Sequence, residues 1–198
     1  MSDRMMRHLE ELAQKELPLR RDAMARILEQ ERFSYTTQEA SASYKNAQGV
    51  VNYLIETGTA PGLLFCAHYD AVAGSTGAND NAAAVCILLR LADSLRERNI
   101  SARFAFFDGE EAGNAGSKLY VSSMDRTLIT GVINLDMMLE QMEVTTTMHG
   151  GSRDSVECIE PETMEKMYEY LLESVTAKDE EQTTGGLFGR FMKRRENS

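Results

Sequence analysis

The chain of 198 residues is 42% hydrophobic and carries a formal net charge of -10 at pH 7. This length and composition fit one domain with a full hydrophobic core. The negative charge argues against binding to a nucleic-acid backbone or to an anionic membrane surface. The N-terminal residues form a polar helix pattern, and no apolar run approaches the roughly 20 residues that span a bilayer.

The three cysteines are Cys66, Cys86 and Cys158. Their number is odd and no C-x-x-C spacing occurs, which favours reduced cysteines in the core of the protein. Reduced cysteines are typical of the cytoplasm, so we expect a cytoplasmic protein.

Hydrophobic periodicity divides the chain into helices and strands. The predicted elements are, in order, helices over 3–16 and 18–32, strands over 34–40, 49–56 and 63–67, a helix beginning at Asp80, a strand over 102–107, a helix over 115–122, strands over 132–135 and 143–148, and a helix over 161–175. Alternation of this kind predicts a three-layer α/β/α architecture around a mostly parallel, mixed sheet. We expect residues 1–177 to form a single domain and residues 178–198 a flexible or loosely docked tail.

Four short clusters of polar and acidic residues follow predicted strands or open a predicted helix. They are His68-Tyr69-Asp70, Gly77-Ala78-Asn79-Asp80-Asn81, Asp108-Gly109-Glu110-Glu111-Ala112-Gly113 and Asn134-Leu135-Asp136-Met137. Open α/β sheets bind ligands at the carboxyl ends of their strands. One imidazole with several carboxylates is a ligand set for catalytic Zn²⁺ or a similar divalent cation. A cation would also relieve the repulsion among carboxylates gathered around one cleft.

The spacing within the clusters suggests separate roles. Asp70 lies two residues after His68 on an extended chain, so its carboxylate can hold the ring nitrogen that does not bind the ion. Asp80 can cap its helix and also face the site. Glu110 and Glu111 are adjacent, so one can bind the ion while the other takes a proton from water. Taken singly, these acids are more often helix caps or solvated loop residues, and only their joint order favours a metal site.

The clusters resemble, in order and character, the motifs of the co-catalytic zinc aminopeptidase family. This family includes bacterial leucyl aminopeptidases, glutamate carboxypeptidases and glutaminyl cyclases. The matching runs are His-x-Asp, Gly-Ala-x-Asp-Asn, Glu-Glu-x-Gly-x-x-Gly-Ser and Asn-Leu-Asp-Met, within residues 50–140. The resemblance implies a zinc-peptidase (phosphorylase/hydrolase-like) fold. It further implies an exopeptidase, and most specifically an aminopeptidase that acts on short peptides or aminoacyl amides through a metal-activated water.

By position, the resemblance also implies a role for each acidic residue. The ligands that it implies for one zinc are His68, Asp80 and Asp136. Asp80 and Glu111 resemble the ligands of a second zinc, Glu110 resembles the general base, and Asp70 the support of His68. The implied cofactor is one or two Zn²⁺ ions, with Co²⁺ or Mn²⁺ as alternatives.

The resemblance implies one more histidine after the last long helix, and the sequence has none after Val175. The candidates for this position are His149, His8 from a second copy in a homo-oligomer, and the tail acids Asp179, Glu180 and Glu181. Two other functions therefore stay open. One is a single-metal amidohydrolase or cyclase on the same scaffold. The other is a non-catalytic binding or assembly module that keeps a relic of the metal site.

Overall fold

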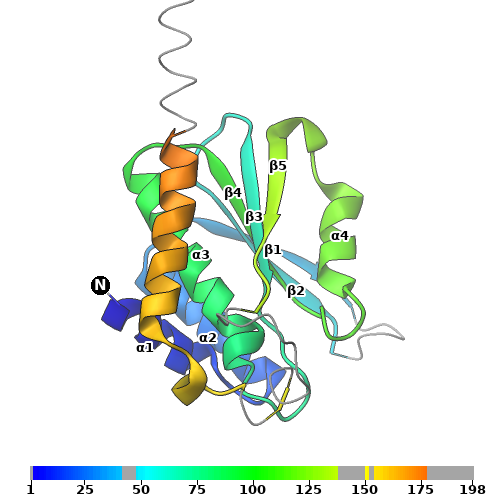
Figure 1. The fold of residues 1–198 in the computed structure, drawn as a ribbon. Coiled ribbons are helices and arrows are strands. Elements are labelled where there is room, and N and C mark those ends of the chain that lie inside the picture. The colour runs from blue at the N-terminus through cyan, green and yellow to red at the C-terminus, as the bar shows by residue number, and fades with distance from the viewer. Residues whose placement is uncertain (1, 42–47, 138–149, 152–153, 178–198) are drawn as a thin grey trace, which may run out of the picture.

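Five strands form one mixed sheet in the order β1-β2-β4-β3-β5 (Figure 1). The structure is a computed structural model, and it describes residues 2–41, 48–137, 150–151 and 154–177. The strands are β1 (Tyr35–Ala40), β2 (Val50–Glu56), β3 (Gly62–His68), β4 (Ala102–Phe107) and β5 (Ile129–Asn134). β2 pairs antiparallel with β1 and β4, whereas β3 pairs parallel with β4 and β5. The carboxyl ends of β3, β4 and β5 therefore meet at one end of the sheet.

Helices cover both faces of this sheet (Figure 1). The helices are α1 (Ser2–Leu12), α2 (Leu17–Gln30), α3 (Ala83–Glu97), α4 (Ala115–Ser123) and a last helix over residues 161–177, with short turns at Arg126–Leu128 and Val156–Cys158. α4 lies on one face, and the other helices lie on the opposite face. The predicted three-layer α/β/α architecture with a mixed sheet is confirmed, and its parallel part is the β4-β3-β5 half.

The two faces of the sheet are unequally covered. On one face, Phe65 and Phe104 stack at 5.2 Å between ring centroids and pack with the apolar side chains of α1, α2, α3 and the last helix. On the other face, a small buried cluster contains Leu64, Cys66, Ala105 and Phe107. Val132 of β5 remains 60% exposed. The α4 face is therefore partly open next to β5.

The helix predicted to begin at Asp80 begins three residues later, at Ala83. Residues Ala78–Ala82 form a single π-helical turn (η1), and Asp80 has the non-helical angles φ -121° and ψ 81°. The N-cap residue of α3 is Ala82, and it provides no side-chain cap. The expectation that Asp80 caps the helix is therefore wrong, because its backbone turns away from the helical path.

Several predictions fall outside the described residues. They concern the strand over 143–148, the ligand candidate His149 and the tail over 178–198. Of the helices that the structure describes, none combines the length and the apolar character needed to cross a membrane. The separation of a domain from a tail stays a prediction.

Candidate metal centre

The side chains of His68, Asp80 and Asp136 converge at the carboxyl ends of β3 and β5. His68 Nε2 lies 3.0 Å from Asp80 Oδ1 and 3.6 Å from Asp136 Oδ1. One ligand atom from each of the three residues lies within 4.8 Å of the others. His68 and Asp80 are buried, whereas the Asp136 side chain is 48% exposed. The group is therefore anchored in the protein and accessible from the Asp136 side.

These donors fit a divalent cation. One imidazole nitrogen and two carboxylate oxygens are ligands that Zn²⁺ accepts, and three protein ligands leave a further position open, as in catalytic sites. On the other side of the ring, His68 Nδ1 lies 3.2 Å from the backbone oxygen of Asp70 and 3.5 Å from its carboxylate Oδ1. Such a partner fixes the orientation of a metal-binding histidine. Nε2 is thus the nitrogen that faces the two acids.

The acids that surround His68 also control its charge. Burial opposes protonation of the ring, but the contacts with Asp136, Asp70 and Asp80 outweigh it and raise the pKa of His68 to about 12. In the metal-free protein, a proton on the imidazole balances the nearby carboxylates. A cation among the same oxygens would replace that proton, because a histidine binds metal through a neutral nitrogen.

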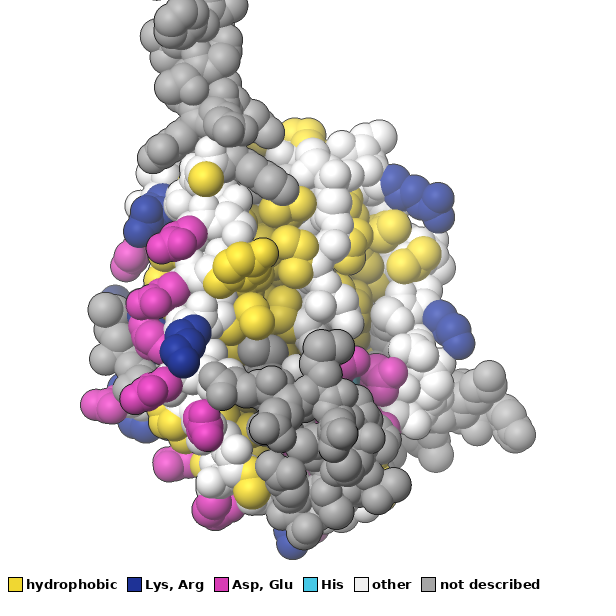
Figure 2. Space-filling model, in the orientation of Figure 1, with side chains coloured by type: hydrophobic (Ala, Val, Ile, Leu, Met, Phe, Trp, Pro, Cys, Tyr) yellow, Lys and Arg dark blue, Asp and Glu magenta, His cyan; other side chains and the backbone are white. Residues whose placement is uncertain are grey.

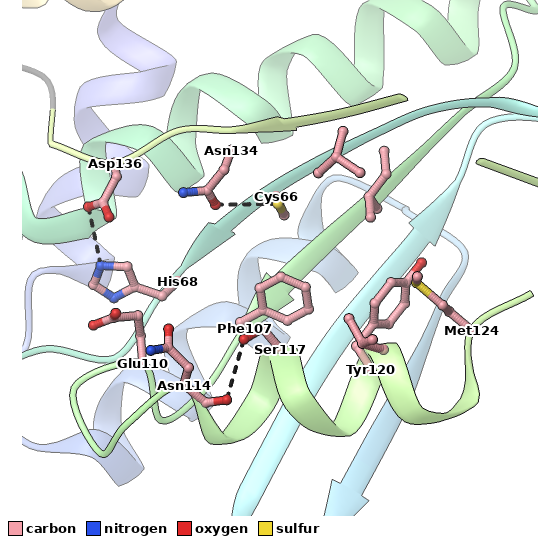
Figure 3. Close-up of a pocket in the computed structure, with 13 residues that line it drawn as sticks. Cys66, His68, Phe107, Glu110, Asn114, Ser117, Tyr120, Met124, Asn134 and Asp136 are labelled. Carbon is pink, nitrogen blue, oxygen red and sulfur yellow. Dashed lines mark hydrogen bonds and ion pairs between the residues drawn. The ribbon is translucent and has the colours of Figure 1, made fainter. Parts of the chain in front are cut away.

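Asp70 connects the loop after β3 to the loop after β4. Its Oδ1 accepts a hydrogen bond from the amide of Glu110 at 3.0 Å, and its Oδ2 accepts one from the amide of Glu111 at 3.1 Å. Glu110 lies next to His68 at the edge of an open groove (Figure 3). Among the described residues, Glu111 is not in the three-residue ligand group, so its role as a ligand of a second ion stays a prediction.

Asn81 holds Asp136 from both sides. Its Nδ2 donates to the backbone oxygen of Leu135 at 2.8 Å, and its Oδ1 accepts from the amide of Met137 at 3.3 Å. The peptide bond between Asp80 and Asn81 is cis. Asn81 follows Asp80 directly in the chain, and its side chain binds the backbone on both sides of Asp136. One residue therefore links Asp80 and Asp136. Asn81 belongs to the Gly-Ala-x-Asp-Asn motif, and its position next to Asp80 is the sequence signal for this role.

A groove of about 340 Å³ leads from the metal centre along the α4 face of the sheet (Figure 3). Its polar end contains His68, Glu110 and Asp136, and Figure 3 shows Glu110 and Asp136 on opposite sides of His68. Its apolar walls contain Leu64, Cys66, Phe107, Tyr120, Val121, Met124 and Val132. Hydrophobic side chains also gather on the surface around β5 (Figure 2). The groove therefore combines a polar centre with room for an apolar group.

The fold and the converging residues define an α/β protein with a candidate metal centre at the carboxyl end of its sheet. Residues 50–185 match the model of peptidase family M28. The chain belongs to this family, and the resemblance stated from the sequence motifs is confirmed. A curated relative, the probable lipoprotein aminopeptidase LpqL of Mycobacterium tuberculosis, is 32% identical over 111 residues. That match covers 52% of this chain and 22% of the relative, so the chain spans about a fifth of it.

Solved structures share the fold at low sequence identity. A Zn-dependent exopeptidase from Parabacteroides distasonis has a TM-score of 0.70 at 14% identity, covering 88% of this chain and 97% of its own. A glutaminyl cyclase from Porphyromonas gingivalis has a TM-score of 0.74 at 12% identity, covering 90% and 98%. The zinc aminopeptidase BSAP from Bacillus subtilis has a TM-score of 0.57 at 18% identity, covering 67% and 51%. These similarities establish the fold.

Proposed function

We propose that this chain is a metal-dependent exopeptidase, and specifically an aminopeptidase that removes N-terminal residues from short peptides. The observation that carries the proposal is the convergence of His68 Nε2 with the oxygens of Asp80 and Asp136 at the polar end of a groove. Glu110 lies at the same end of the groove. Membership of peptidase family M28 supports a peptide as the substrate.

The charge of the groove favours the amino end of a peptide. Glu110 and Asp136 line it, and none of its described lining residues is a lysine or an arginine. A free α-ammonium group would be attracted to these carboxylates, whereas a C-terminal carboxylate would be repelled. The name of the relative LpqL, a probable aminopeptidase, agrees with this preference.

Each residue of the site has a separate task in the proposed reaction. His68, Asp80 and Asp136 would hold the cation, and Asp70 keeps Nε2 of His68 directed at it. When bound, a divalent cation polarises the scissile carbonyl and lowers the pKa of water at the site. Glu110, fixed through its amide by Asp70, would take the proton from that water and deliver it to the leaving amine. The proposed cofactor is one or two Zn²⁺ ions, with Co²⁺ or Mn²⁺ as alternatives.

Hydrolysis of aminoacyl amides and dipeptides in the presence of Zn²⁺, Co²⁺ or Mn²⁺ tests the proposal. N-acetylated versions of the same peptides should resist cleavage. Glu110→Gln should lower kcat by about 10²–10⁴-fold while the protein still binds the metal, because the variant loses only proton transfer. Glu169→Gln on the exposed face of the last helix is the matched control and should keep full activity. If Glu110→Gln were as active as the wild type, the role of Glu110 as general base would be contradicted.

A second candidate, a single-metal amidohydrolase or cyclase, has one observation in its favour. The described residues bring together one group of three ligand residues rather than two groups. Metal stoichiometry separates the candidates, since one tightly bound ion per chain favours this function and two favour the aminopeptidase. A protein that binds Zn²⁺ and releases ammonia from peptides with an N-terminal glutamine, without cleaving peptide bonds, would be a cyclase.

A further inference from the structure

Two buried charged residues from distant parts of the chain bind the loop that carries Asp80. This loop, residues 69–80, leads from the end of β3 into η1. Arg20 of α2 is 1% exposed, and Asp154, just before the turn Val156–Cys158, is 2% exposed. Buried charges are costly unless they are paired and hydrogen-bonded. The hydrogen-bond partners of Arg20 and Asp154 therefore indicate what these two buried charges do.

Asp154 makes four hydrogen bonds to the loop. Its Oδ1 accepts from the backbone amides of Asn79 at 2.9 Å and Asp80 at 3.1 Å. Its Oδ2 accepts from the hydroxyl of Ser75, and its backbone oxygen accepts from Thr76 Oγ1 at 2.5 Å. The carboxylate thus holds the backbone of the very residue whose side chain faces His68.

Arg20 ties together two separate parts of the same loop. Its Nε donates to the backbone oxygen of Tyr69 at 2.5 Å, and its Nη1 donates to that of Thr76 at 2.5 Å. Its Nη2 donates to the backbone oxygen of Gly77 at 3.5 Å. Tyr69 directly follows His68, so these bonds connect the chain next to the imidazole with the chain that leads to Asp80.

Arg20 also carries a charge into this buried region. Burial lowers the pKa of Arg20 to about 10, and the carboxylates of Asp70 and Asp154 oppose that decrease. Arg20 is therefore still ionised at neutral pH. Its positive charge balances Asp154, while its fork of N–H groups satisfies carbonyls that would otherwise be buried without donors.

We propose that Asp154 and Arg20 are positioning residues of the metal centre, which set the spacing between His68 and Asp80 by holding the backbone of the loop between them. The proposal rests on the proposed metal site and extends it to residues that touch neither the ion nor the substrate. Partners of this kind usually change metal affinity by about 10–100-fold when they are removed.

Zinc affinity of the full chain, measured by competition with a chelating indicator, tests the role of Asp154. Asp154→Ala should weaken Zn²⁺ binding by about 10–100-fold. Asp154→Asn should recover most of that loss, because an amide oxygen can still accept from both backbone amides. The matched control is Asp125→Ala, since Asp125 also holds a backbone amide, that of Thr127, but before the start of β5. The control should bind Zn²⁺ like the wild type.

The same measurement tests Arg20 with a closely matched control. Arg20→Lys keeps the charge but loses the planar fork, so Zn²⁺ binding should weaken by about 10-fold. Arg103 is also buried and donates to two carbonyls, those of Ala60 and Leu128, before the starts of β3 and β5. Arg103→Lys should lower the Tm of the metal-free protein but leave Zn²⁺ affinity unchanged. The visible spectrum of bound Co²⁺ should change in Arg20→Lys only.

Folded variants of Asp154 and Arg20 that lose Tm but bind Zn²⁺ like the wild type would overturn the proposal, because the two residues would then be purely structural. If Asp154→Ala does not fold, the variant Ser75→Ala tests the role of Asp154 instead. This variant removes the bond to Oδ2 and the bond that Ser75 Oγ accepts from the amide of Gly77 at 3.0 Å, but it keeps the bonds from the amides of Asn79 and Asp80 to Asp154. It should weaken Zn²⁺ binding measurably; unchanged binding would overturn the proposal. A wild-type protein that binds no divalent ion would instead contradict the metal site itself, and the inference with it.

Discussion

The amide of Glu110 donates a 3.0 Å hydrogen bond to Asp70 Oδ1, so the residue proposed as the general base depends on a side chain from the neighbouring strand end. Asp70→Asn replaces one acceptor oxygen by an NH₂ donor, which leaves one backbone amide without its partner. We expect kcat/KM for an aminoacyl amide to fall by about 10–100-fold. Asp125→Asn is the control, and an unchanged kcat/KM in Asp70→Asn would contradict the assigned role.

The raised pKa of His68 makes the metal-free protein sensitive to pH. The unfolded histidine titrates near 6.5, whereas contacts with three acids raise the folded pKa to about 12. Between these values the folded state binds the extra proton, so stability falls as the pH rises. The Tm of the metal-free protein should therefore decrease from pH 6.5 to pH 8. His68→Gln should show a flatter profile, and identical profiles would contradict the proton on His68.

Zn²⁺ should stabilise the protein and displace that proton. A ligand that binds only the folded state at 100 times its Kd stabilises it by about 2.7 kcal/mol. For a chain of this length the Tm should rise by about 5–10 °C. Calorimetry in buffers of different ionisation enthalpy should detect about one proton released per ion. Asp136→Asn should reduce both effects, and EDTA should reverse the rise in Tm; a rise of equal size in Asp136→Asn would argue against its role as a ligand.

Gly77 and Gly74 offer a matched pair of substitutions. Both have a positive φ, +56° and +86°, so alanine is strained at each by about 1–2 kcal/mol. A Cβ at Gly77 would also lie 2.4 Å from Ala71 Cβ and 2.8 Å from the backbone oxygen of Asp80, whereas nothing lies within 4 Å at Gly74.

In urea unfolding, Gly77→Ala should therefore lose about 2–4 kcal/mol and Gly74→Ala only about 1 kcal/mol. Because the collision at Gly77 moves the Asp80 backbone, Zn²⁺ affinity should fall in Gly77→Ala alone. Equal effects of the two substitutions would show that the space around Gly77 does not constrain the loop.

The sequence was informative where local pattern and chemistry agree. The strand over 63–67 is a continuous apolar run, and the strand over 102–107 was predicted as buried. The motifs that contain His68, Asp80 and Asp136 predicted one common site. The cap role of Asp80 failed because a helix pattern shows only which residues pack. The backbone angles of Asp80 are non-helical, and its amide and that of Asn79 are bonded to Asp154, which is distant in the sequence. The cytoplasmic location and the homo-oligomer stay predictions.

The roles of Arg20 and Asp154 could not be predicted from sequence pattern or motif. Arg20 is one of several charged residues in an ordinary amphipathic helix, and Asp154 lies in a segment without periodicity. What makes them important is that tertiary folding places them against the backbone of residues 69–80. Hydrogen bonds to backbone atoms leave no motif, because any sequence supplies the carbonyls and amides that accept or donate.

The position of α2 bears on where this protein can be divided. The family match begins at residue 50, after both N-terminal helices. A fragment cut there would retain His68, Asp80 and Asp136, yet it would lose the guanidinium of Arg20 that joins Tyr69 to Thr76. On the proposed role of Arg20, we expect the smallest unit that assembles the centre to extend beyond the family match over residues 50–185.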